Sequence, residues 1–136
     1  MTEVARLIPH ADAFVALVRS VLGSGATVYL DEVPDSPRYP YVVVYSDPGE
    51  HAHDSLGAQL EHVQFHPAVV VAAVSATQHR MVRNDLFKVL GADLVVPGRV
   101  CDLSTMSSNP MARDTDVPDR VVMWSRDLFL IDSWAA

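Results

Sequence analysis

A strand is predicted over residues 120–133, which read RVVMWSRDLFLIDS. Side chains alternate between the two faces of a strand, and here both faces carry large apolar residues. One face would hold Val122, Trp124, Leu128 and Leu130 together with Arg126, and the other would hold Val121, Met123, Phe129 and Ile131 together with Ser125 and Asp127. Such a strand is either covered on both sides or lies at a contact between subunits.

Other strands are predicted from short runs of β-branched and aromatic residues, at positions 27–31, 41–46, 62–75, 94–96 and 99–103. The run at 62–75 is the longest of these. Pro67 within it lacks the N–H that a strand uses for pairing, so we expect a kink or an edge there. A proline-rich segment at 34–40 and a polar segment at 107–119 are predicted to be irregular.

Two helices are predicted from apolar residues at three- and four-residue spacing. The first covers residues 9–22, with Pro9 in its first turn and Gly23 as the residue that ends it. The second begins at a cap on Ser75 or Thr77 and runs to about residue 90. Its buried stripe is expected to be Met81, Val82, Leu86, Val89 and Leu90, and Arg80, Arg83 and Lys88 are expected to face away.

The order of these elements predicts the fold class. It runs helix, two strands, long loop, strand, helix, and then two or three further strands. Two α-helices packed on a mostly antiparallel mixed β-sheet form an α+β sandwich, and we predict that fold for residues 1–136 as a single domain. The chain has 136 residues, enough for a core that needs neither disulfides nor metals.

The charge balance excludes several classes of function. The chain has 17 acidic and 10 basic side chains, a formal net charge of −7, and 49 % apolar residues. Generic binders of nucleic acid or anionic membranes rely on dense Lys and Arg, so neither class fits. One cysteine, Cys101, leaves no disulfide framework. With no targeting signal and no apolar run of membrane length, we expect a soluble protein made in a reducing cytoplasm.

Residues 47–61, DPGEHAHDSLGAQLE, form the most unusual segment, with four carboxylates and neither Lys nor Arg. His51 and His53 lie in it, flanked by Glu50 and Asp54. Such residues can bind zinc, which keeps a small metal-dependent hydrolase as an alternative to the simpler interpretation of exposed loop residues. Cys101 is expected to be a packed structural thiol. The sequence has no nucleophile elbow and no glycine-rich phosphate loop, so no catalytic residues are predicted.

Several segments together resemble one family. They are LIPHADAFVALVRSVLG at 7–23, VYLDEVP at 28–34, YPYVVVYSDPG at 39–49, VPGRVCDL at 96–103 and DTDVPDRVVMWSRDLFLI at 114–131. In this order they are similar to the tail terminator proteins, also called minor tail or tail completion proteins, of long-tailed phages (siphophages) that infect actinobacteria. The resemblance covers nearly the whole chain.

The resemblance implies a structural role without catalysis or a cofactor. Members of the family are similar to the lambda tail terminator fold and form a hexameric ring on the last ring of the tail tube. That ring ends polymerisation of the tube and joins the head, so the partners implied are the major tail tube protein and a head-completion or connector protein. DNA would pass through the ring without specific binding. The location implied is the head-proximal end of the tail in the virion, after assembly in the cytoplasm of the bacterial host.

Contacts with ring neighbours or with the tube are expected at charged and apolar positions in the unusual segment, in the polar segment 107–119 and in the final strand. These candidates are Asp47, Glu50, Asp54, Leu60, Arg113, Asp116, Trp124, Arg126 and Phe129. The acidic segment 47–61 would also suit a position facing the pore, where negative charge repels the phosphates of DNA. Another head–tail connector or head-completion subunit is the nearest alternative to the terminator.

Overall fold

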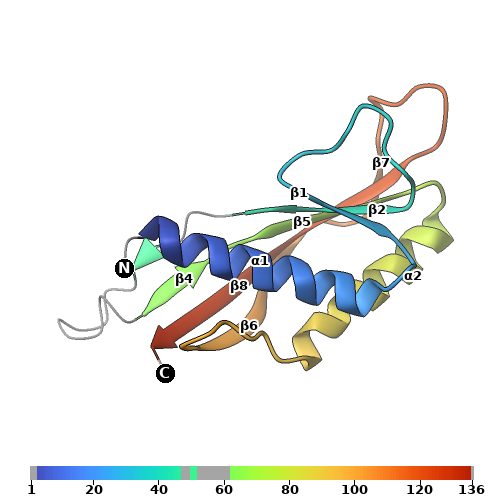
Figure 1. Ribbon diagram of the computed structural model, residues 1–136. Coiled ribbons are helices and arrows are strands. Elements are labelled where there is room, and N and C mark those ends of the chain that lie inside the picture. Colours follow the sequence, from blue (N-terminus) through green and yellow to red (C-terminus); the bar gives the residue numbers. More distant parts are fainter. Residues whose placement is uncertain (1–2, 47–49, 52–61, 136) are drawn as a thin grey trace.

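The computed structural model describes residues 3–46, 50–51 and 62–135 of the chain. Along the chain, the helices and strands are α1 (Glu3–Leu22), β1 (Thr27–Leu30), β2 (Tyr41–Tyr45), β3 (Glu50–His51), β4 (Val63–Phe65), β5 (Ala68–Ala73), α2 (Ala76–Leu86), a 3₁₀ helix η1 (Phe87–Gly91), β6 (Arg99–Ser108), β7 (Ala112–Arg113) and β8 (Met123–Ala135). In this part of the chain the strands form one mixed sheet, with both α-helices on one of its faces (Figure 1). The predicted α+β class is confirmed.

Strand β8 lies in the middle of the sheet and is its longest strand. On one side it pairs antiparallel with β5 and, further along, with β4. On the other side it pairs antiparallel with β6 and then with β7. Beyond β5 lie β2 and then β1, and β1 runs parallel to β2. The final strand of the sequence therefore organises the whole sheet.

Strands β4 and β5 behave as one interrupted strand. Phe65 lies opposite Ile131 and Ala68 lies opposite Leu128, so the register is the same on both sides of the break. Pro67 at the break has no N–H to donate, but its carbonyl accepts a 3.0 Å hydrogen bond from the N–H of Phe129. Where the sequence predicts a kink or an edge at Pro67, the strand is interrupted at residues 66–67 and is otherwise continuous along β8.

The core lies between the helices and the covered face of the sheet. Helix α1 contributes Phe14, Val15, Val18 and Leu22, the region of α2 and η1 contributes Val82, Leu86 and Val89, and the sheet contributes mainly Val42, Val44, Val69, Val71, Phe129 and Ile131. The residues predicted to end the first helix and to begin the second also do so in the structure. Gly23 adopts a positive φ of 55° and donates to the carbonyl of Arg19 at 2.9 Å, and the Ser75 hydroxyl accepts from the N–H of Gln78 at 3.1 Å.

The helix predictions need four corrections. Helix α1 begins at Glu3, and Pro9 lies inside it; proline favours the first turn only on average, and inside a helix it removes one backbone hydrogen bond. Helix α2 ends at Leu86 and passes into η1. Met81 is 65 % exposed and Leu90 is 40 % exposed, so neither is in the buried stripe. Arg83 does not face away, because its guanidinium reaches a buried carboxylate of β8.

The strand predictions need four smaller corrections. The final strand, predicted over residues 120–133, is β8 and covers Met123–Ala135. Residues 94–96 form no strand, although Leu94 and Val96 are buried. Strand β6 continues to Ser108, five residues past the predicted end, because it pairs along most of β8. The polar segment 107–119 is not wholly irregular, since it contains the end of β6 and the short strand β7.

Candidate interaction surface

The covered face of β8 carries polar side chains that hold the two helices in place. His79 of α2 lies with its Nε2 2.8 Å from the Ser125 hydroxyl oxygen. His10 of α1 lies with its Nε2 2.7 Å from the Ser133 hydroxyl oxygen. All four side chains are buried. The distances in these two His–Ser pairs are those of catalytic pairs. A catalytic serine must be accessible to its substrate, however, and both serines are buried under the helices.

An ion pair supports α2 on the same face. The Arg83 guanidinium donates to both carboxylate oxygens of Asp127, at 3.2 and 2.9 Å, and Asp127 is fully buried. A buried carboxylate is tolerated only when it is paired and hydrogen-bonded. Burial lowers the pKa of the neighbouring His79, and the positive charge of Arg83 lowers it further. His79 is therefore the neutral member of this group at pH 7.

Ser133 is the centre of a second polar group, near the end of β8. Arg99 of β6 donates from Nε to the Ser133 hydroxyl at 2.8 Å and from its Nη2 to the Ser133 carbonyl at 2.8 Å. Cys101 lies beside the same hydroxyl, at 3.7 Å. Burial raises the pKa of the Cys101 thiol. A protonated, half-buried thiol is a poor nucleophile, which agrees with a structural role for Cys101.

The other face of β8 has a different composition. Trp124, Leu128 and Leu130 are half-buried, and Trp134 keeps 38 % of its surface exposed. Arg126 is exposed among them. Both helices lie on the opposite side of the sheet (Figure 1). We call this set of five β8 residues the open face.

The open face ends in an ordered aromatic group. The rings of Trp134 and His62 are stacked with centroids 4.7 Å apart. The His62 ring also lies 2.9 Å from the Asp132 carboxylate, which accepts a second bond from the side-chain amide of Gln64 at 2.9 Å. An aromatic residue held in one rotamer loses little entropy when a partner binds it, so Trp134 suits a contact position.

An apolar patch lies beside this end of the sheet. Val95 is 75 % exposed, Val100 is 57 % exposed and Leu90 is 40 % exposed, and all three line one surface hollow. Val100 is also the β6 residue opposite Trp134 in the sheet register. Apolar groups that cluster on a surface indicate contact with a partner more often than isolated ones do. Sequence reasoning missed this patch, because Val100 and Leu90 sit in patterns that predict burial.

The sequence-based contact candidates are only partly brought together. Trp124 and Arg126 belong to the open face. Arg113 in β7 and Asp116 in the following turn are exposed near the start of β8, and the Asp116 N–H donates to the Asp114 carboxylate at 2.9 Å. Glu50 pairs through its backbone with Gln64 at the edge of the sheet. Asp47, Asp54 and Leu60 lie outside the described residues.

Phe129 must be removed from the candidate contacts. Its side chain has 0 % exposure and packs between the rings of Phe14 and Phe87, with centroids 5.6 and 5.8 Å away. The alternation of β8 places it on the covered face. Its neighbours Leu128 and Leu130 lie on the open face and replace Phe129 as candidate contacts, although the sequence pattern did not single them out.

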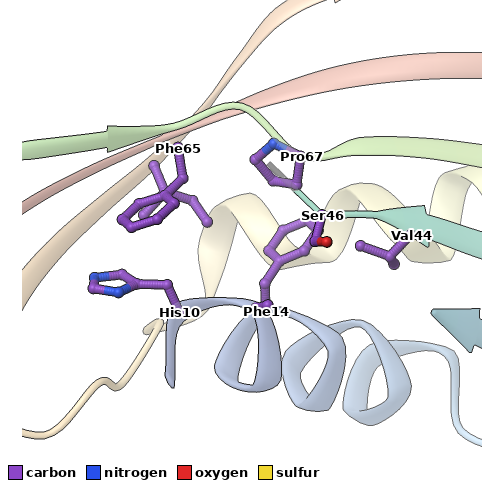
Figure 2. Close-up of a pocket in the computed structure, with 8 residues that line it drawn as sticks. His10, Phe14, Val44, Ser46, Phe65 and Pro67 are labelled. Carbon is purple, nitrogen blue, oxygen red and sulfur yellow. The ribbon is translucent and has the colours of Figure 1, made fainter. Parts of the chain in front are cut away.

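The structure offers little room for a small ligand in the core. Figure 2 shows a pocket lined by His10, Phe14, Val44, Phe65 and Pro67 among others. Its cavity volume is about 10 Å³, which at most accommodates one water molecule. The stacking of the His10 and Phe65 rings, with centroids 4.3 Å apart, closes one side. This cavity is a packing feature between α1 and the sheet.

A metal centre gains no support from the described residues. Within them, no three His, Cys, Asp or Glu side chains are grouped closely enough to hold an ion. The backbone of His51 pairs with β4 as part of β3, and His53 lies outside the described part of the chain. Over the same residues, neither α-helix has the length and apolar character of a membrane span.

Comparison with known proteins yields a likeness of fold. No family model and no curated protein matches the chain. A chain in the structure described as "Virion of native gene transfer agent (GTA) particle" superposes with a TM-score of 0.57, covering 88 % of this chain and 86 % of that one at 16 % sequence identity. The likeness is one of fold. It spans both proteins almost completely, so the arrangement of helices on the sheet is shared as a unit.

Proposed function

We propose that this chain is a structural protein of a phage-like virion. The observation that carries the proposal is the fold that it shares, over nearly its whole length, with a chain of a gene transfer agent virion. The open face and the apolar patch of Leu90, Val95 and Val100 are consistent with a protein that works by contact with other proteins. The two buried His–Ser pairs serve to hold the helices.

More specifically, we propose that the chain is a tail terminator. In this role it forms a ring on the last ring of the tail tube, ends polymerisation of the tube and presents a surface to the head connector. The sequence resemblance to tail terminators supports this role, and so does a half-exposed apolar strand face that another subunit can cover. The ring is hexameric if the chain follows that family, and DNA passes through it without specific binding, as its net charge of −7 favours.

Contact residues follow from the structure and the sequence together. The open face supplies Trp124, Leu128, Leu130 and Trp134, with Arg126 to orient a charged partner group. Arg113 and Asp116 extend the surface toward the start of β8. Asp47, Glu50, Asp54 and Leu60 are proposed as contacts from the sequence alone.

The first experiment measures mass by light scattering, for the chain alone and then mixed with the tail-tube subunit from the same genome. The proposal predicts a closed ring, or a monomer that assembles at tube ends and stops their growth. A chain that ignores tubes and binds the portal side of the head would instead be a connector subunit. A chain that binds neither would contradict a role at the head–tail joint.

A further inference from the structure

A groove with a volume of about 620 Å³ lies between α2 and the connection from β6 to β7. One wall includes Arg80, Arg83 and Asn84, which are three and four residues apart and so share one side of the helix. The other wall is residues 108–111, held to the sheet by a 2.9 Å bond from the Asn109 N–H to the Arg126 carbonyl. The lining residues include no carboxylate. The groove is therefore a site rich in N–H donors.

The two arginines of the groove differ in how they are used. Arg83 gives two N–H groups to Asp127 and lies over the Phe87 ring, 4.6 Å from its centroid. A guanidinium has five N–H donors, so Arg83 is held in place with donors to spare. Arg80 is exposed and forms no ion pair within the described part of the chain. A carboxylate that enters the groove would meet one fixed and one available guanidinium.

The described part of the acidic segment 47–61 is Glu50–His51, which forms β3 at one edge of the sheet. Strand β3 pairs with β4, and β4 pairs with residues 131–133 of β8. The groove is tied to β8 at Ser125 and Asp127 and lies on the side of β6 and β7. Along β8 the two places are about 20 Å apart, at about 3.3 Å per residue, and they are on opposite sides of that strand. A contact between them is natural between two copies.

We propose that the groove beside Arg80 and Arg83 binds the acidic segment 47–61 of a second copy of this chain. The proposal rests on the self-association in the proposed function and names its contact. The segment has four carboxylates and no Lys or Arg, which complements the groove in charge. Donor and acceptor surfaces are different patches, which permits a head-to-tail contact, and such contacts form a ring when the rotation between successive copies closes.

The binding test uses a synthetic peptide of residues 46–62 as the probe and the full chain as the receptor. At low ionic strength, where surface charges are least screened, the peptide should bind the wild type. Arg80→Glu should weaken that binding at least about tenfold. Arg83 is left intact because it pairs with Asp127. The matched control is Arg19→Glu, the same charge reversal on an exposed position of α1, which should leave binding unchanged.

A mixing test then separates head-to-tail contact from other association. Chains with Arg80→Ala, chosen because a glutamate would attract the lysines of the second variant, and chains with Asp47, Glu50 and Asp54 all changed to Lys should each fail to self-associate. An equimolar mixture should form heterodimers that stop there, because only one intact groove and one intact segment remain. Sedimentation velocity reads out both results.

Three outcomes would overturn the inference. They are a peptide that does not bind, binding that Arg80→Glu leaves intact, and a DNA duplex that binds at Arg80 in place of the peptide. Self-association that survives the lysine substitutions would also overturn it, and would return the acidic segment to a position facing the pore. Tube capping by the wild type is scored separately. Capping without peptide binding contradicts only this inference, and peptide binding without capping contradicts only the terminator role.

Discussion

The two faces of β8 reverse the usual distribution of polar and apolar residues. The face under the helices contains Ser125, Asp127 and Ser133 beside two buried apolar residues, Phe129 and Ile131. The open face contains Trp124, Leu128, Leu130 and Trp134 with Arg126, and Asp132 lies on the same side of the strand. The covered face can hold polar groups because each has a partner on a helix or on β6. The open face has apolar groups without a helix above them, which is the pattern of a surface that another protein covers.

The largest effect is expected from deleting a large side chain on the covered face. Phe129→Ala removes a ring packed between Phe14 and Phe87 and should lower the free energy of unfolding by about 4 kcal/mol. Leu130→Ala, one residue away on the open face, should cost only about 1 kcal/mol. Urea denaturation of both variants compares the faces directly. Equal losses would mean that the open face is also core.

A smaller loss is expected when the polar anchor of α2 is broken. Asp127→Asn removes the charge that pairs with Arg83 and should cost about 2 to 3 kcal/mol, because a buried charge-assisted bond is lost. Asp85 pairs with Lys88 in an exposed position, so Asp85→Asn should stay within about 0.5 kcal/mol. Thermal melts at fixed pH distinguish the two. Similar melting temperatures would show that the buried pair does not hold α2.

Low pH should lower the free energy of unfolding through the same group of contacts between α2 and β8. The pKa of His79 is lowered from 6.5 in the folded chain by burial and by Arg83 and Arg80, against an opposing effect of Asp127. The unfolded chain therefore binds the proton more tightly, so the contribution is complete above about pH 6.5 and is lost as the pH falls below that value. His79→Gln should flatten this part of the curve of stability against pH. A curve of unchanged slope would exclude His79 as its source.

The predicted parts of the fold are those that local rules control. The caps at Gly23 and Ser75, the irregularity at Pro67 and the alternation of β8 depend on neighbouring residues, and the sequence indicates all of them. Which face of β8 the helices cover depends on partners far along the chain, such as His10 and His79. Hydrophobicity alone favours neither face.

The candidate contacts were harder to predict for the same reason. Trp124 and Arg126 lie on the open face, but Phe129 points the other way although it is the most apolar of the three. Val95 and Val100 lie in runs that predict strands, but Val95 is in no strand and both side chains are exposed. The Arg80–Arg83 groove required the 108–111 connection to lie beside α2, a contact that no local pattern encodes.

A modest effect on stability should come with a large effect on assembly. Leu130→Asp on the open face should cost about 2 kcal/mol, because the loss expected for Leu130→Ala is joined by the poor strand propensity of Asp. It should weaken association with tail tubes at least about tenfold, because a charge enters a surface suited to apolar contact. Met81→Asp is the matched control, since Met81 is 65 % exposed on α2, away from the open face. Binding to tubes immobilised on a surface measures both. Loss of binding in the control as well would remove the distinction between the faces.

The most direct measurement follows the length of tail tubes by electron microscopy as tube subunits polymerise with and without this chain. A terminator caps tube ends, so tubes grown with the wild type should stop lengthening and should not resume when more subunits are added. Tubes grown with Leu130→Asp should continue to lengthen. Tubes that lengthen equally in the presence and absence of the wild-type chain would contradict the account.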